Sequence, residues 1–134
     1  MIDLQYAIIT EVSLSVADAA IAVRRSAEAH KWGVLGAYDF TEILGSKGFG
    51  GHPAMKTVDI CSPANADKML GMERSVGVFL PCNIMIYAEG GKTFVATLRP
   101  SAVFAKTFPG ASEAFHAQAK AIEAELEAIF GANA

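Results

Sequence analysis

The fold follows from one stretch of the chain, Cys82-Asn83-Ile84-Met85-Ile86-Tyr87-Ala88-Glu89-Gly90-Gly91-Lys92-Thr93-Phe94-Val95-Ala96-Thr97-Leu98-Arg99. At its centre, Glu89-Gly90-Gly91-Lys92 predicts a β-hairpin with a two-residue loop, because both glycines accept the positive φ that such a turn requires. The loop fixes the register of the two strands. The register places three pairs on one face of the hairpin: Tyr87 opposite Phe94, Met85 opposite Ala96, and Asn83 opposite Leu98.

Both faces of this hairpin are largely apolar. An antiparallel sheet with one face in water alternates cleanly between apolar and polar residues, and this hairpin does not. We therefore expect helices to cover one face and a second subunit to cover the other, which predicts a homodimer. The face opposite Tyr87, Met85 and Asn83 carries Cys82, Ile84, Ile86, Thr93, Val95, Thr97 and Arg99.

Outward from the hairpin, three more strands are predicted over residues 4–13, 33–39 and 55–61. A helix is predicted from the capping residue Ser15 to His30 or Lys31, because apolar residues recur at steps of three and four. A second long helix is predicted from about 110–112 to 130, ended by Gly131. Shorter helical segments are expected at 41–44 and 63–70, with a glycine-rich connector at 45–53.

The apolar stripes of the two long helices are Val16, Ala20, Val23 and Ala27 in the first, and Phe115, Ala119, Ile122, Leu126 and Ile129 in the second. The predicted fold class is therefore α+β: an antiparallel sheet with a long C-terminal helix packed on it. At ~1.5 Å per residue that helix is long enough to cross a whole sheet.

Composition limits the classes of function. The chain has 134 residues, so we expect one domain over 1–134. Its net charge is −3 and it has no basic block, so we expect no nucleic-acid partner. No apolar run approaches the ~18 residues of a spanning helix, and the N-terminus does not read as a signal peptide, so we expect no membrane partner and a cytoplasmic protein. The hydrophobic fraction of 52% suggests apolar surface hidden in a subunit contact or a ligand cavity.

Order and spacing along nearly the whole chain resemble the domain of unknown function 302 family. The segments that carry the resemblance are Cys61-Ser62-Pro63-Ala64-Asn65-Ala66, Leu80-Pro81-Cys82-Asn83-Ile84, the hairpin loop 89–92 and Arg99-Pro100. The resemblance implies a helix-grip, TBP-like fold of the α+β class, β-α-β4-α: a curved antiparallel sheet with a long C-terminal helix packed across it. It also implies a dimer, and it implies no activity.

Cys82 is the candidate for thiol chemistry, because it stands at the entrance of a strand. A catalytic thiol needs a lowered pKa, and Arg99, opposite Cys82 in the predicted register, is the cation that would stabilise a thiolate. The alternative, which we favour, is that Cys82 is a small buried hydrophobe beside Ile84. Cys61 is a possible partner of Cys82, and in a reducing compartment both are expected to be free thiols.

His52 lies before Pro53 in the glycine-rich connector. Neither it nor the cysteines have the spacing of a metal motif, so we expect no metal and no cofactor. The candidate ligand-binding residues are Cys82, His52, Cys61 and Tyr87.

Three functions remain open. The first is a binding module that holds a small apolar ligand in the groove between the sheet and the C-terminal helix. The second is a homodimeric structural or regulatory protein, and the third is a thiol-dependent redox protein that uses Cys82. The sequence favours them in that order, and so favours a protein that is not an enzyme.

Overall fold

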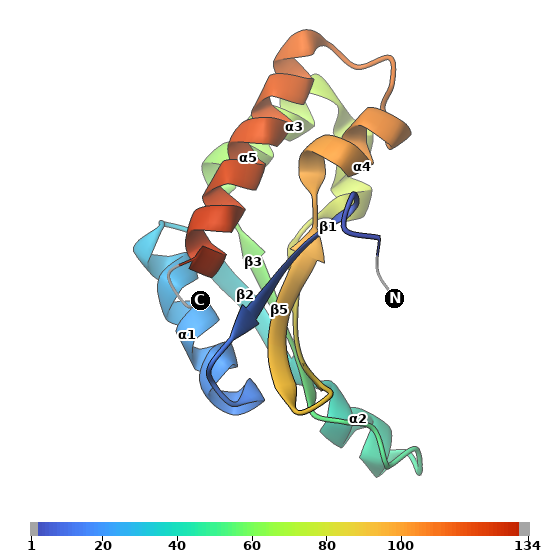
Figure 1. Cartoon of the computed structure of the whole chain (residues 1–134). Coiled ribbons are helices and arrows are strands. Elements are labelled where there is room, and N and C mark those ends of the chain that lie inside the picture. The colour runs from blue at the N-terminus through green and yellow to red at the C-terminus, as the bar shows by residue number, and fades with distance from the viewer. Residues whose placement is uncertain (1–2, 132–134) are drawn as a thin grey trace.

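The computed structural model describes residues 3–131, which form a bowed five-stranded antiparallel sheet with two long helices on one of its faces (Figure 1). The order of strands across the sheet is β1-β5-β4-β3-β2. The predicted α+β class, with a long C-terminal helix against an antiparallel sheet, is confirmed. The strands are β1 Ala7–Val12, β2 Gly33–Asp39, β3 Met55–Cys61, β4 Cys82–Glu89 and β5 Lys92–Leu98.

The hairpin of β4 and β5 forms the middle of the sheet, because β5 also pairs with β1 and β4 also pairs with β3. Gly90 and Gly91 have φ values of 58° and 75°, so the turn has the positive φ that was predicted for both residues. The observed pairs include Met85 with Ala96 and Tyr87 with Phe94, which confirms the predicted register.

Helix α1, Val16–Ala29, begins as predicted at Ser15, whose Oγ accepts a hydrogen bond of 3.1 Å from the backbone N–H of Asp18. Its predicted apolar stripe faces the sheet, and all four residues of that stripe are buried. The chain leaves the helix through Lys31, which has a φ of 66°, and then buries Trp32.

Helix α5, Glu113–Gly131, lies on the same side of the sheet as α1, and its C-terminal end meets α1 (Figure 1). Its predicted stripe is buried, and Phe115, Ala119, Leu126 and Ile129 are each 0% exposed. Ser26 Oγ of α1 donates a hydrogen bond of 2.8 Å to the backbone carbonyl of Ile129, which ties the two long helices together. The predicted stop at Gly131 coincides with the last described residue.

Four shorter helical segments complete the fold. Two were expected from the sequence, α2 Phe40–Ser46 and α3 Pro63–Met72. The other two were missed, the 3₁₀ helix η1 Arg74–Phe79 and the helix α4 Pro100–Thr107. Both lie between the predicted elements and bring Phe79 and Phe104 over the ends of the strands, with ring centres 5.2 Å apart.

The two faces of the central hairpin have different surroundings. Ile84, Ile86 and Val95 are at most 1% exposed and form part of the core beneath the helices. On the opposite face Met85, Tyr87 and Phe94 are only half-buried. At the edge of that face, α2 supplies Phe40 and Leu44 to a hollow that Met85 and Tyr87 also line. We call this side the open face of the sheet.

A matched pair of leucine substitutions tests how far α5 depends on its buried stripe. Leu126 is 0% exposed and Leu35 is 64% exposed. We expect Leu126→Ala to lower the free energy of unfolding by about 2–5 kcal/mol, because it removes buried surface and leaves a cavity. The control Leu35→Ala should cost about 0.5 kcal/mol or less. Urea denaturation measures both, and equal losses would contradict the assignment of the core.

Candidate functional site

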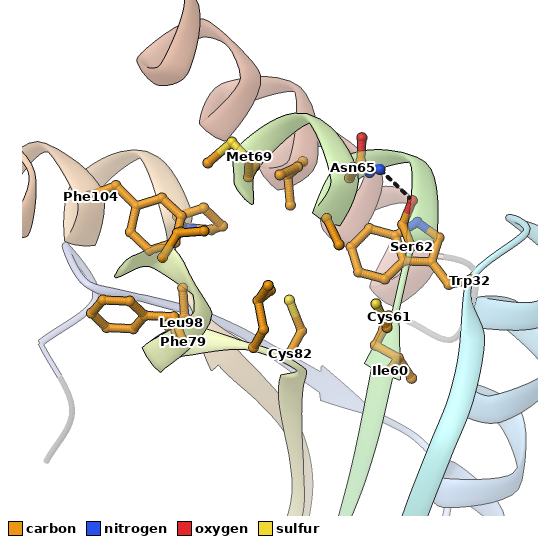
Figure 2. Close-up of a pocket in the computed structure, with 15 residues that line it drawn as sticks. Trp32, Ile60, Cys61, Ser62, Asn65, Met69, Phe79, Cys82, Leu98 and Phe104 are labelled. Carbon is orange, nitrogen blue, oxygen red and sulfur yellow. Dashed lines mark hydrogen bonds between the residues drawn. The ribbon is translucent and has the colours of Figure 1, made fainter. Parts of the chain in front are cut away.

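A pocket lies where β3 and β4 end beneath the helices (Figure 2). Strand ends form its floor, α3 and α4 form its roof, and Ile122 of α5 closes one side. The space open to the centre of a water molecule is about 30 Å³. Fifteen residues line it: Trp32, Ile60, Cys61, Ser62, Asn65, Ala66, Met69, Val76, Phe79, Leu80, Cys82, Leu98, Pro100, Phe104 and Ile122.

The polar side chains in this wall already have partners. Asn65 donates from Nδ2 to Glu125 Oε2 at 2.7 Å and accepts at Oδ1 from Gln118 Nε2 at 2.8 Å. Trp32 Nε1 donates to Glu125 Oε1 at 3.2 Å, so one carboxylate of α5 holds both residues. Ser62 Oγ accepts the backbone N–H of Asn65 at 3.3 Å and caps α3. Apolar carbon, the two thiols and the thioether of Met69 are what the wall offers a ligand.

Cys61 and Cys82 line this pocket together. They come from neighbouring strands, since Ile60 pairs with Cys82, and Figure 2 shows both side chains pointing toward the helices. Both are free thiols. The pKa of Cys82 is raised from 9.0 to about 11, first by burial of the thiol and then by the charge that Cys61 would carry. At neutral pH Cys82 is therefore a neutral S–H group, which is poor as a nucleophile.

The predicted role of Arg99, to stabilise a thiolate at Cys82, is wrong. Arg99 Nη1 forms ion pairs with Glu123 and Glu127 of α5, each at 3.1 Å, and Glu123 also accepts hydrogen bonds from the backbone N–H and the Oγ of Ser101. The guanidinium is thus held by two carboxylates and connects the end of β5 to α5. It does not lower the pKa of the thiol.

The four predicted ligand-binding residues do not share one pocket. His52 and Tyr87 line a separate hollow of about 150 Å³ on the open face, with Phe40, Leu44 and Met85 among its other residues. Cys82 and Tyr87 are at opposite ends of β4 and, five residues apart, point to opposite faces at a distance of roughly 17 Å along the strand. The predicted set therefore separates into two halves, Cys61 with Cys82 in the pocket and His52 with Tyr87 in the hollow on the open face.

Several residues of the pocket escaped the sequence analysis. Met69, Phe79 and Phe104 enter from α3, η1 and α4, and two of these elements were not predicted. The useful signals were Pro100, which suits the first turn of a helix, and the repeated phenylalanines 104, 108 and 115, whose rings pack against one another.

Residues 3–131 contain no group of three or more His, Cys, Asp or Glu side chains placed to hold a metal ion. None of the described helices has both the length and the apolar character to cross a membrane.

The fold and pocket define an α+β domain with a helix-covered sheet and an apolar cavity at the end of its central strands. Comparison with protein families places it more closely: residues 8–132 match the family described as domain of unknown function DUF302, and the chain belongs to that family. A search of curated proteins gave no match.

A solved structure supports the same assignment. The crystal structure of an uncharacterized conserved DUF302 protein from Bacillus stearothermophilus superposes with a TM-score of 0.88 and 26% sequence identity. The alignment covers 96% of this chain and 98% of that one, so the two share the whole domain.

Thiol titration tests the state of Cys82. In a Cys61→Ser variant, which leaves Cys82 as the reporter, we expect the alkylation rate to rise with a midpoint above pH 9.0, because burial still raises the pKa of this thiol after the charge of Cys61 has been removed. Since the folded pKa lies above 9.0, the unfolded state loses its proton first, and the free energy of unfolding should fall as pH rises through this range. A midpoint below neutral pH would contradict this description.

A pair of glutamates tests the role of the Arg99 contact. The side chain of Glu123 is 16% exposed, while that of Glu127 is 52% exposed, although both touch Arg99. We expect Glu123→Ala to cost about 2 kcal/mol in the free energy of unfolding, because it strips partners from Arg99 and Ser101. Glu127→Ala should cost about 0–1 kcal/mol. Equal costs would show that the contact with Ser101 contributes nothing.

Proposed function

We propose that this protein binds a small, uncharged, mostly apolar molecule in the pocket lined by Cys61 and Cys82. One observation carries the proposal: none of the fifteen lining residues is charged, and the polar side chains among them are already hydrogen-bonded. A charged ligand would lose its hydration there without gaining a partner. An apolar ligand has no such hydration to lose.

The size of the pocket limits the ligand. A water molecule needs ~10–15 Å³ of such space, so about 30 Å³ holds few atoms as the side chains stand. Met69 is unbranched and adapts its shape readily, so its movement would admit a single ring. The ligand class we propose is therefore a neutral molecule no larger than about one aromatic ring.

One feature of the fold supports this proposal, and the thiols suggest where the protein works. Helix α5 packs against the sheet, as the proposed helix-grip fold would require, and supplies both Ile122 and the carboxylate of Glu125 that holds the pocket wall. The two unpaired thiols suit a reducing compartment such as the cytoplasm.

A second candidate function is self-association through the open face of the sheet. What supports it is the half-buried apolar group of Ile9, Met85, Tyr87 and Phe94 on this face. Tyr87 and Phe94 are stacked, with ring centres 5.5 Å apart, and offer a flat apolar surface. Such a face is typical of an interface between subunits.

The third candidate, a thiol-dependent redox protein, has less support. Its chemistry requires a thiolate at neutral pH, and the raised pKa of Cys82 works against one.

A thermal-shift experiment with benzene tests ligand binding. We expect benzene at about tenfold its dissociation constant to raise the Tm of the wild-type protein by ~4 °C. Ala66→Leu should abolish this shift, because the larger side chain grows into the pocket from α3.

Ala64→Leu is the matched control, since Ala64 is exposed on the same helix and does not line the pocket. It should keep the shift. A wild-type protein that shows no shift with benzene, or an Ala66→Leu variant that keeps it, would overturn the proposed function.

A further inference from the structure

The segment 40–53, which comprises α2 and the glycine-rich connector, projects from the rest of the fold (Figure 1). We call it the arm. None of the seven residues of α2 is buried, and Phe40, Ile43 and Phe49 are 36%, 41% and 65% exposed. A helix of one or two turns is marginal without tertiary packing. Apolar side chains at its surface therefore indicate a missing partner surface.

The open face of the same chain has a hollow of about 670 Å³, lined by Leu4, Ile9, Met85, Tyr87, Glu89 and Phe94 among others. Its floor is the stacked pair of Tyr87 and Phe94. Leu4 at its margin is 65% exposed. The hollow is therefore apolar, broad and uncovered in a single chain.

Arm and hollow lie on the same side of the sheet. Figure 1 shows α2 leaving the lower end of the sheet on the side away from α1, and Phe40 and Leu44 line one hollow together with the open-face residues Met85 and Tyr87. A two-fold axis facing that side would bring the arm of each copy to the open face of the other. Such a contact is reciprocal and closed, as in most homodimers.

The charges of the two surfaces are complementary. Lys47 stands at the tip of the arm, two residues before Phe49, and Glu89 stands in the wall of the hollow. Neither has a salt-bridge partner within residues 3–131, whereas the neighbouring Glu11 is paired with Lys92 at 3.5 Å. A Lys47–Glu89 pair between two copies would align the arm over the hollow.

We propose that the arm docks on the open face of a second copy of this chain, with Phe49 in the hollow floored by Tyr87 and Phe94 and Lys47 beside Glu89. The inference rests on the proposed self-association and names the contact that produces it. It does not involve the Cys61–Cys82 pocket, which lies at the other end of β4.

Light scattering of the full chain provides the test. We expect a dimer at about 100 µM and a dissociation constant at least ~10-fold higher for Phe49→Asp, because a buried apolar anchor is replaced by a charge. Val78→Asp is the matched control, since Val78 is 84% exposed and lies on η1, outside the arm. Circular dichroism and Tm establish that each variant is folded.

A charge exchange tests the contact without removing apolar surface. Lys47→Glu and Glu89→Lys should each raise the dissociation constant several-fold, and the double variant should return it to near the wild-type value. The double variant has the two charges exchanged between positions 47 and 89. Recovery of the dimer in that variant therefore identifies a direct contact between these two residues.

The outcomes separate the two proposals. A wild-type chain that stays monomeric at about 100 µM overturns both self-association and the arm contact. A dimer that persists in Phe49→Asp overturns the arm contact and leaves self-association through the sheet in place. Equal dissociation by Val78→Asp, or a double charge variant no better than the singles, also overturns the arm contact.

Discussion

Pairing of β4 with β5 across Gly90 and Gly91 is the constraint from which the other contacts follow. Because the turn fixes which residues lie opposite each other, it also fixes which side chains share a face. Ile84, Ile86 and Val95 are thereby directed to the helices, and Met85, Tyr87 and Phe94 to the open face. A shift by one residue would exchange the two sets and remove the surface on which α1 and α5 pack.

Polar contacts then connect α5 to the elements at the ends of the strands. The carboxylate of Glu125 holds Trp32 on one oxygen and Asn65 on the other, so it connects α5 to the start of β2 and to α3. Arg99 connects α5 to the end of β5. These contacts keep α3 and α4 above the strand ends, and the space beneath them becomes an apolar pocket whose polar groups are satisfied.

Sequence patterns were informative where a local rule applied. Gly90-Gly91 determined the hairpin, Ser15 began α1, and the stripe from Phe115 to Ile129 predicted the covered face of α5. The helix α4 and the 3₁₀ helix η1 were missed because both are short and because their apolar residues pack against residues that are distant in sequence. Periodicity cannot show this, since Phe79 and Phe104 are 25 positions apart in sequence but pack together.

The candidate site was harder to predict than the fold. Cys61 and Cys82 meet because β3 and β4 pair, but the sequence did not establish that pairing, and it also grouped His52 and Tyr87 with them. Arg99 was assigned to the thiol from its register alone, whereas its charge is taken up by α5. Electrostatic partners depend on elements that come from distant parts of the chain, and local spacing does not identify them.

Trp32 gives the pocket an optical property. The chain contains one tryptophan, and its indole forms part of the pocket wall while its N–H is held by Glu125. Intrinsic emission excited at the red edge therefore originates at this wall and nowhere else in the molecule. The colour and intensity of that light report the polarity and occupancy of the cavity without any added label.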